Sequence, residues 1–238
     1  MNQETDIIDI KIIGLGGIGS ALSDSVSRFL NYKSTSSIYK VTLVDGDSFQ
    51  TKNFERQTFL VEGRNKAEAK KEELKERFKN VIFISEPVFV NDDNISKLIK
   101  EKNIVLLAVD NHKTRKVVSD YCSKLNNITL ISGGNEITEG NVQIFFKKDG
   151  EKITPSLTDY HQEIDNPQDK SPEEKSCQEL QQSEPQLYFT NLMASCFMCA
   201  ALYNVMNESY QYSEVYFDVS KMKADSKIRK VKEVKKDS

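Results

Sequence analysis

The sequence predicts an α/β fold: a mainly parallel sheet with helices on both faces and an antiparallel C-terminal extension. Short apolar runs alternate with helical segments through the first 132 residues, as expected for successive strand–helix crossovers. A glycine-rich turn follows the first apolar run directly. After residue 133 a further strand, 141–147, has no crossover helix before it, so we expect it to pair antiparallel. Together these features are typical of a Rossmann-like architecture.

Each predicted element rests on a local signal. The apolar runs are short and bounded by glycine or polar residues, as buried strands are. In chain order we expect strand 7–13, helix 17–30, strand 38–45, helix 66–79, strand 81–85, a short helix ending at 100, strand 104–109, helix 111–125 and strand 128–132. A helix from Pro185 to about residue 207, apolar nearly all round, and a last strand at 215–219 follow.

The chain divides into four regions by composition. Residues 1–147 are expected to form a nucleotide-binding domain. Residues 148–184 contain three of the five prolines and many charges, which predicts a long exposed loop carrying Cys177. Residues 185–220 are expected to add a helix and a strand that pack on the same domain, and the lysine-rich residues 221–238 a flexible tail.

Bulk properties exclude several classes of protein. A net charge of −3 over 238 residues gives no reason to expect a nucleic-acid partner. The acidic, polar start lacks the order of a signal peptide, and the apolar stretch 192–203 is too short to span a bilayer, so no membrane association is expected. Four cysteines do not suggest a disulfide framework. We therefore expect a cytoplasmic protein.

The strongest local motif is the glycine turn at 14–20. Gly14, Gly16 and Gly19 fit G-x-G-x-x-G between a strand and a helix, with Gly17 and Ser20 beside them. Backbone N–H groups at such a helix start bind phosphate. The alternative, a glycine-rich packing turn, is the less favoured interpretation in this context.

The motif alone does not distinguish ATP from NAD. Asp45, at the end of the second strand, suits a ribose of either nucleotide. The next segment favours ATP, because it brings cations and amides next to the ribose position, and triphosphate chemistry needs them whereas hydride transfer does not. These residues are Asn53, Arg56, Gln57 and Lys66. Taken singly, each could belong to a solvated surface loop.

The ordered set of motifs resembles a known family. Gly14-x-Gly16-Gly17-x-Gly19-Ser20, Asp45-x-Asp47, Asn53-x-x-Arg56-Gln57, Gly63-x-x-Lys66 and Val109-Asp110-Asn111 with Arg115 are similar, in this order, to motifs of ThiF, MoeB and the adenylation domains of ubiquitin-activating enzymes. Residues 1–147 would then be an adenylation domain. Later stretches, including Ser176-Cys177, resemble a compact bacterial ThiF-type branch. The resemblance implies that the chain adenylates the C-terminal carboxylate of a ubiquitin-like protein.

The resemblance also implies residue roles. Asp45 would hold the ATP ribose, with Asp47 beside it, while Arg56 and Lys66 hold phosphates. Asn53 and Gln57 would help to orient them. Asp110 is the implied Mg²⁺ ligand, a hard oxygen donor used together with substrate phosphates, and Asn111 adjoins it. Alternatively, the Asp110–Asn111 pair only caps the following helix.

The thiols and histidines divide by context. Cys177, beside Lys175 in the polar segment, is our candidate for an acyl-accepting nucleophile, because a nearby cation favours the thiolate. Cys196 and Cys199 form a single Cys-x-x-Cys pair within an apolar helix, whereas a structural zinc site needs four ligands. We expect no zinc, and we expect His112 and His161 at the surface.

Partners follow from the same resemblance. We expect a ubiquitin-like protein substrate, a ubiquitin-conjugating-type enzyme as the next acceptor and a homodimer. The apolar helix 186–207 either lies in the core or packs against its copy. Three alternatives stay open: adenylation of a small-molecule or tRNA-linked carboxylate, an NAD-binding dehydrogenase and an inactive nucleotide-binding scaffold.

Overall fold

The computed structural model describes residues 6–33, 37–51, 53, 57, 62–174, 187–209 and 212–232. The strands are β1 (Ile7–Ile13), β2 (Ile38–Val44), β3 (Val81–Glu86), β4 (Ile104–Leu107), β5 (Ile128–Asn135), β6 (Glu139–Lys148), β7 (Glu151–Lys152), β8 (Glu214–Asp218) and β9 (Lys223–Lys227). The helices are α1 (Gly17–Tyr32), α2 (Lys66–Arg77), α3 (Ile95–Leu98), α4 (His112–Lys124), α5 (Gln162–Asp165) and α7 (Tyr188–Met206), with 3₁₀ turns η2 (Leu157–Asp159) and η3 (Pro172–Glu174).

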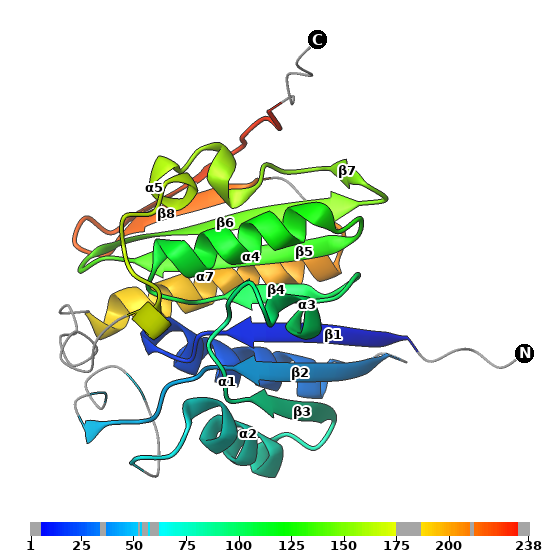
Figure 1. Ribbon diagram of the computed structural model, residues 1–238, viewed down its shortest axis with the longest axis vertical. Coiled ribbons are helices and arrows are strands. Elements are labelled where there is room, and N and C mark those ends of the chain that lie inside the picture. Colours follow the sequence, from blue (N-terminus) through cyan, green and yellow to red (C-terminus); the bar gives the residue numbers. More distant parts are fainter. Residues whose placement is uncertain are drawn as a thin grey trace, which may run out of the picture.

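One nine-stranded sheet organises the molecule (Figure 1). Its strand order is β3-β2-β1-β4-β5-β6-β8-β9, and β7 pairs with β6. The β3, β2, β1, β4 and β5 strands pair in parallel. From β5 onward every pairing is antiparallel. The predicted Rossmann-like sheet and its antiparallel C-terminal extension are therefore confirmed.

Helices cover both faces because the strands are apolar on both sides. On one face, α1, α2 and α7 pack with side chains such as Ile10, Val41 and Met198 into one core cluster. On the other, α3 and α4 pack with Val105 and Phe145 into a second cluster. Figure 1 shows α4 and α3 in front of the sheet and α1 and α7 behind it.

By length and composition alone, helix α7 is long and apolar enough to cross a membrane. The sequence suggests a shorter apolar stretch, 192–203, which would be too short. It packs against α1 and against β5 and β6. Met198 lies so close to Gly133 of β5 that a side chain there would collide with its sulfur. One side of α7 therefore lies in the core, which is one of the two arrangements that its apolar sequence allowed.

Two regions are more ordered than the sequence suggests. The expected loop 148–184 contains β7, η2, α5 and η3 within its described part, and Leu157 and Ile164 are buried against the α4 side of the sheet. These two apolar residues are isolated among charged residues in the sequence, so no apolar periodicity predicts a helix or strand there. The expected flexible tail 221–238 contains the edge strand β9, whose residues are all exposed. Its sequence has no alternation of apolar and polar residues that would predict a strand.

The sheet order also fixes where a ligand can bind. From β1 the chain crosses to β2 on one side, and later β4 pairs on the other side of β1. The connections at the carboxyl ends of β1 and β4 therefore run in opposite directions and leave a crevice between them. In open α/β sheets ligands bind at this switch point.

Candidate nucleotide and acyl site

A cavity of about 740 Å³ lies at the carboxyl ends of the parallel strands. Its first half lies at the ends of β1, β2 and β4 and against the segment after β3, and its apolar lining is Ile13, Val44, Val88, Phe89, Val90, Ala108 and Val109. Its second half lies at the ends of β5, β6 and β8, with polar lining residues Asn135, Glu136, Glu139, Asn141, Glu163 and Tyr216. We call these the nucleotide half and the acyl half, after the ligands that the sequence motifs lead us to expect there.

The glycine turn separates β1 from α1 at the wall of the cavity. Gly14 has φ +87° and approaches the backbone of Ala108 so closely that a Cβ atom would lie 2.8 Å from the Ala108 carbonyl oxygen. A Cβ at Gly19 would overlap the carbonyl of Gly14. A Cβ at Gly16 would meet nothing within 4 Å, since Gly16 faces the open cavity. The turn thus exposes backbone at the start of α1, as phosphate binding requires.

Not every residue of the motif reaches the cavity. Gly14, Gly16 and Gly17 line it. Gly19 and Ser20 do not: Gly19 packs on Gly14, and Ser20 is buried in the first turn of α1, where its N–H donates to the Gly16 carbonyl. Their contribution to the site is therefore the close packing of helix against strand.

Asp45 joins the glycine turn to the end of β2. Its Oδ2 accepts from the Leu15 N–H at 2.6 Å and its Oδ1 accepts from the Asp47 N–H at 2.8 Å. Burial raises the pKa of Asp45 above its ordinary value, although Lys66 and these two N–H donors act in the opposite direction. Asp45 lines the nucleotide half, and each of its carboxylate oxygens has a lone pair left to accept from a ribose hydroxyl.

A buried lysine lies on the same side. The Lys66 Nζ is 2.6 Å from Asp47 Oδ2, and Lys66 is 5% exposed while the Asp47 side chain is about half exposed. Asn65 holds this arrangement in place and was not in the predicted site. Its side chain caps α2 by accepting from the N–H groups of Ala67 and Glu68, and it donates to the carbonyls of Asp45 and Asp47. A polar residue before a helix is the usual sign of such a cap.

Two buried amides complete this wall. Asn53 is 4% exposed, and its Oδ1 accepts from the Gln50 N–H at 3.0 Å. Gln57 is also 4% exposed and lines the cavity, and its buried Oε1 has no partner among the described residues. An unsatisfied buried acceptor costs stability. The Gln57 Oε1 atom is therefore suited to accept a hydrogen bond from a ligand. Arg56, predicted between them, lies outside the described residues.

Asp110 follows β4 and lines the cavity. It is exposed to the cavity and forms no ion pair within the described part of the chain. Asn111 caps α4 by accepting from the Thr114 N–H at 2.8 Å, so the capping role belongs to Asn111 and leaves the Asp110 carboxylate available. Mg²⁺ in phosphate sites is bound by one or two carboxylates together with phosphate oxygens and water. A lone exposed carboxylate beside a phosphate-binding turn fits that ion.

Arg115 binds the backbone next to Asp110. Its guanidinium donates to the Val109 carbonyl at 2.7 Å, the Gly133 carbonyl at 2.8 Å and the Ser132 hydroxyl at 3.1 Å. Burial lowers the pKa of Arg115 to about 10, although nearby carboxylates, Asp110 first, act in the opposite direction. Arg115 therefore stays charged and joins the ends of β4 and β5.

The acyl half contains residues that the sequence did not single out. Glu163 comes from α5 and Tyr216 from β8, both far along the chain from the glycine turn. His112 also lines the cavity, with its Nδ1 buried and without a partner among the described residues. The expectation of a surface position is wrong for His161, whose side chain is only 11% exposed and lies between two carboxylates.

None of the described cysteines lines the cavity. Burial raises the pKa of Cys122 to about 12. Burial likewise raises the pKa of Cys199 to about 12, while Cys196 is exposed on α7 and lines no part of the cavity. Cys177, the predicted acyl acceptor, lies outside the described residues.

The sequence matches a protein-family profile and several named proteins. The ThiF family profile matches residues 6–238. Molybdopterin-synthase adenylyltransferase of Escherichia coli (strain K12) is 28% identical over 145 residues, covering 60% of this chain and 55% of that protein. Adenylyltransferase and sulfurtransferase UBA4 of Kluyveromyces lactis is 28% identical over 139 residues, covering 57% of this chain and 30% of that protein. The chain thus spans about half of the first relative and about a third of the second.

Solved structures share the fold. E. coli MccB crystallised with ATP superimposes with a TM-score of 0.70 at 18% identity, covering 93% of this chain and 63% of that one. PaaA gives a TM-score of 0.64 at 17% identity, covering 93% of this chain and 64% of that one. Because the family profile matches nearly the whole length of the chain, the chain belongs to the ThiF family.

Proposed function

We propose that the protein activates the C-terminal carboxylate of a ubiquitin-like protein by adenylation with Mg·ATP. The observation that carries the proposal is the single cavity region that joins a phosphate-binding turn, a buried lysine and an available carboxylate: Gly16, Lys66 and Asp110. The similarity to named adenylyltransferases supports the same chemistry. The narrower substrate choice rests on the motifs that resemble ubiquitin-activating enzymes.

The apolar lining of the nucleotide half suits the adenine ring, with the ribose hydroxyls on Asp45. The α-phosphate then lies over the glycine turn, and the β- and γ-phosphates extend toward Lys66, Asn53 and Gln57. Binding of the phosphates would draw Lys66 away from Asp47, which is exposed enough to be resolvated. Arg56 would add a second cation on this side.

A substrate carboxylate oxygen attacks the α-phosphorus, the bond to the β-phosphate oxygen breaks, and acyl-adenylate and pyrophosphate form. Lys66 and Arg56 stabilise the negative charge that builds up on the departing pyrophosphate. Mg²⁺, held by Asp110, would neutralise phosphate charge when bound. Cys177 would then attack the acyl carbon as thiolate and release AMP, forming a thioester for transfer to a conjugating-type enzyme.

A homodimer is part of the proposal. The exposed face of α7 presents Phe189, Met193, Cys196, Ala200 and Tyr203, which are spaced by four, three, four and three residues. This spacing is typical of a helix–helix seam. Phe189 is 65% exposed and Tyr203 is 55% exposed in the single chain, so an isologous contact between two α7 helices would bury both.

The proposal is tested with α-labelled ATP, Mg²⁺ and a glycine-ended ubiquitin-like protein. Wild type should transfer labelled AMP to the partner protein, and both Asp110→Ala and Arg56→Ala should lower the rate about 100-fold or more, the loss expected for one transition-state contact. Non-reducing gels should show a thiol-sensitive adduct that Cys177→Ser loses. If wild type forms the AMP adduct but no thioester, adenylation is supported and the step assigned to Cys177 is contradicted.

A further inference from the structure

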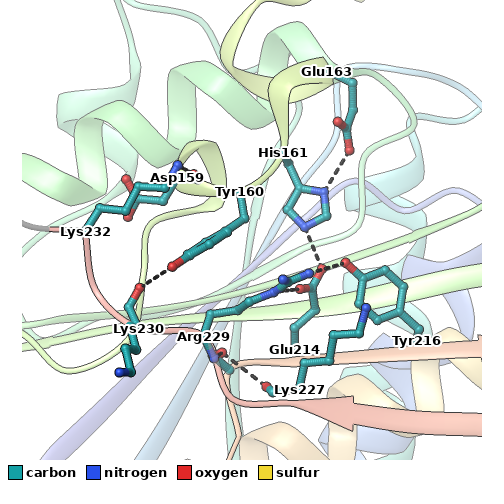
Figure 2. A network of polar contacts seen from close by, with 11 residues as sticks. Asp159, Tyr160, His161, Glu163, Glu214, Tyr216, Lys227, Arg229, Lys230 and Lys232 are labelled. Carbon is teal, nitrogen blue, oxygen red and sulfur yellow. Dashed lines mark hydrogen bonds and ion pairs between the residues drawn. The ribbon is translucent and has the colours of Figure 1, made fainter.

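A chain of charged groups connects the wall of the acyl half to the C-terminal segment (Figure 2). The Nδ1 of His161 lies 2.8 Å from Glu163 Oε1, and its Nε2 lies 2.5 Å from Glu214 Oε1. On the far side of Glu214, Arg229 Nε donates to Glu214 Oε2 at 3.1 Å. Glu214 is 2% exposed, so the centre of this chain is shielded from water.

The geometry fixes the protonation state of His161. A neutral imidazole has one N–H and one acceptor nitrogen, whereas an imidazolium has two N–H donors. Both ring nitrogens of His161 face carboxylate oxygens, which accept hydrogen bonds only. The observed pair of contacts is therefore that of an imidazolium bridging two carboxylates.

The two carboxylates that His161 bridges have different surroundings. Glu214 is buried and receives further hydrogen bonding from Arg229, so its position is fixed by β8 and the C-terminal segment. Glu163 lies on the short helix α5 with a side chain that is 53% exposed, and it lines the acyl half of the cavity. His161 connects the half-exposed side chain of Glu163 to the buried side chain of Glu214.

The C-terminal segment reinforces the same wall. The Arg229 guanidinium lies 5.0 Å from the centroid of the Tyr160 ring, and the Tyr160 hydroxyl donates to the Lys230 carbonyl at 2.7 Å. Arg229 also donates to the hydroxyl of Tyr216, a second residue of the acyl half, at 3.3 Å. Residues 229–230 therefore brace both the turn that carries His161 and the strand that carries Tyr216.

We propose that His161 is a positioning residue for acyl-substrate recognition: as an imidazolium anchored on Glu214, it holds the Glu163 carboxylate in the acyl half, where Glu163 accepts a hydrogen bond from a peptide N–H next to the reacting carboxylate. The inference rests on the proposed function and deepens it, because it makes the acyl substrate a polypeptide C-terminus. A carboxylate held in this way selects against acids that have no amide N–H at that place.

The ionisation of the network agrees with this role. Burial alone would lower the pKa of His161, but hydrogen bonds to Glu214 and Glu163 outweigh burial and raise it above the ordinary value. The pKa of Glu163 is lowered, because hydrogen bonds and the charge of His161 outweigh burial, so Glu163 is an ionised acceptor. The titratable and charged groups around the His161–Glu163 contact are Glu214, Tyr216, Arg229, His112 and the buried Arg115 of α4.

The test uses two inert acyl-adenylate mimics, in which a sulfamate replaces the phosphate. One carries N-acetylglycylglycine and the other is the same molecule with the N–H of the glycine next to the sulfamate replaced by an ester oxygen. Calorimetry at pH 6.5 should give about tenfold tighter binding of the amide than of the ester in wild type, as for one charge-assisted hydrogen bond. Glu163→Ala should reduce this ratio to about one, and His161→Gln to about two or three.

Two further readouts separate positioning from loss of structure. AMP affinity should stay within about twofold in each variant, since AMP contacts only the nucleotide half. The amide-to-ester ratio of wild type should fall as pH rises through the raised pKa of His161, because the neutral ring keeps only one of its two donors, whereas that of His161→Gln should not change with pH. Lys116→Gln, which removes an ion pair between α4 and Asp165 of α5, is the matched control and should keep the wild-type ratio.

The outcomes distinguish the inference from the function on which it rests. If wild type binds neither mimic more tightly than AMP, adenylation itself is contradicted. If wild type binds the amide more tightly and His161→Gln keeps both the full ratio and its pH dependence, the positioning role of His161 is overturned while adenylation stands. An equal affinity of wild type for amide and ester, both tighter than AMP, overturns the role of Glu163.

Discussion

Lys66 Nζ lies 2.6 Å from Asp47 Oδ2 at the start of α2, and this nearly buried lysine lines the cavity. The lysine is held within reach of the position predicted for the β- and γ-phosphates. Asp47 remains half exposed, so the ion pair can be exchanged for a phosphate at low cost.

Replacing Lys66 should therefore affect the triphosphate alone. We expect Lys66→Met to weaken ATP binding about tenfold or more and to leave AMP binding within about twofold, because only ATP extends to the lysine. Calorimetry with both nucleotides measures this. Lys75→Met, an exposed lysine of the same helix, is the control. Equal losses for ATP and AMP would place Lys66 elsewhere in the site.

Removal of the metal should act through Asp110. Chelation of Mg²⁺ should reduce the thermal stabilisation that ATP gives to wild type, because the metal joins phosphate to carboxylate. Asp110→Asn, which keeps the shape but not the charge, should show the same low stabilisation with and without Mg²⁺. If Asp110→Asn still responds to Mg²⁺ as wild type does, the metal is bound by other groups.

The buried network around Glu214 predicts how stability depends on pH. Burial alone would raise the pKa of Glu214, but hydrogen bonds, the one from His161 first, lower it from 4.5 to about 2. Its contribution is thus present above pH 4.5 and is lost as pH falls toward 2. The His161 pKa is raised, so its contribution is present below its ordinary value and is lost as pH rises through the raised one.

Glu214→Gln should therefore lower the free energy of unfolding by about 2 kcal/mol, with the largest difference from wild type between about pH 4.5 and 6.5. Denaturant titrations across pH 2–9 measure this, and Glu208→Gln, an exposed glutamate after α7, is the control. A difference that does not change over the whole range would contradict a role for these two ionisations.

The α7 seam predicts the oligomeric state. Wild type should sediment as a dimer at tens of micromolar, a concentration far above the Kd of a stable interface. Met193→Glu should give a folded monomer, because it places a charge in the middle of the exposed apolar face. A wild-type monomer under these conditions would exclude the seam.

The nucleotide half could be predicted from sequence because its signals are local. The glycine turn and Asp45 directly follow apolar strands, and Asp110 comes shortly after another. Parallel strands bring their carboxyl ends to one edge of the sheet. The roles assigned to Arg56 and Cys177 remain predictions, since both lie outside the described residues.

The acyl half could not be predicted in this way. Tyr216 reaches the cavity through the pairing of β8 with β6, and Glu163 reaches it through the packing of α5 against α4, so both depend on long-range contacts. His161 gave no signal either, because its partner Glu214 lies 53 residues away. From sequence alone, charged residues in a polar segment are expected to be solvated. Only the folded structure shows which of them form ion pairs with residues far along the chain.

The central claim, that the cavity binds Mg·ATP, is tested most directly by thermal unfolding with ATP and with NAD. At about 100 times its Kd, ATP with Mg²⁺ should add about 2.7 kcal/mol, which raises Tm by about 5–10 °C for a chain of this size. NAD at the same concentration should leave Tm unchanged. A rise in Tm with NAD and none with Mg·ATP would contradict the account.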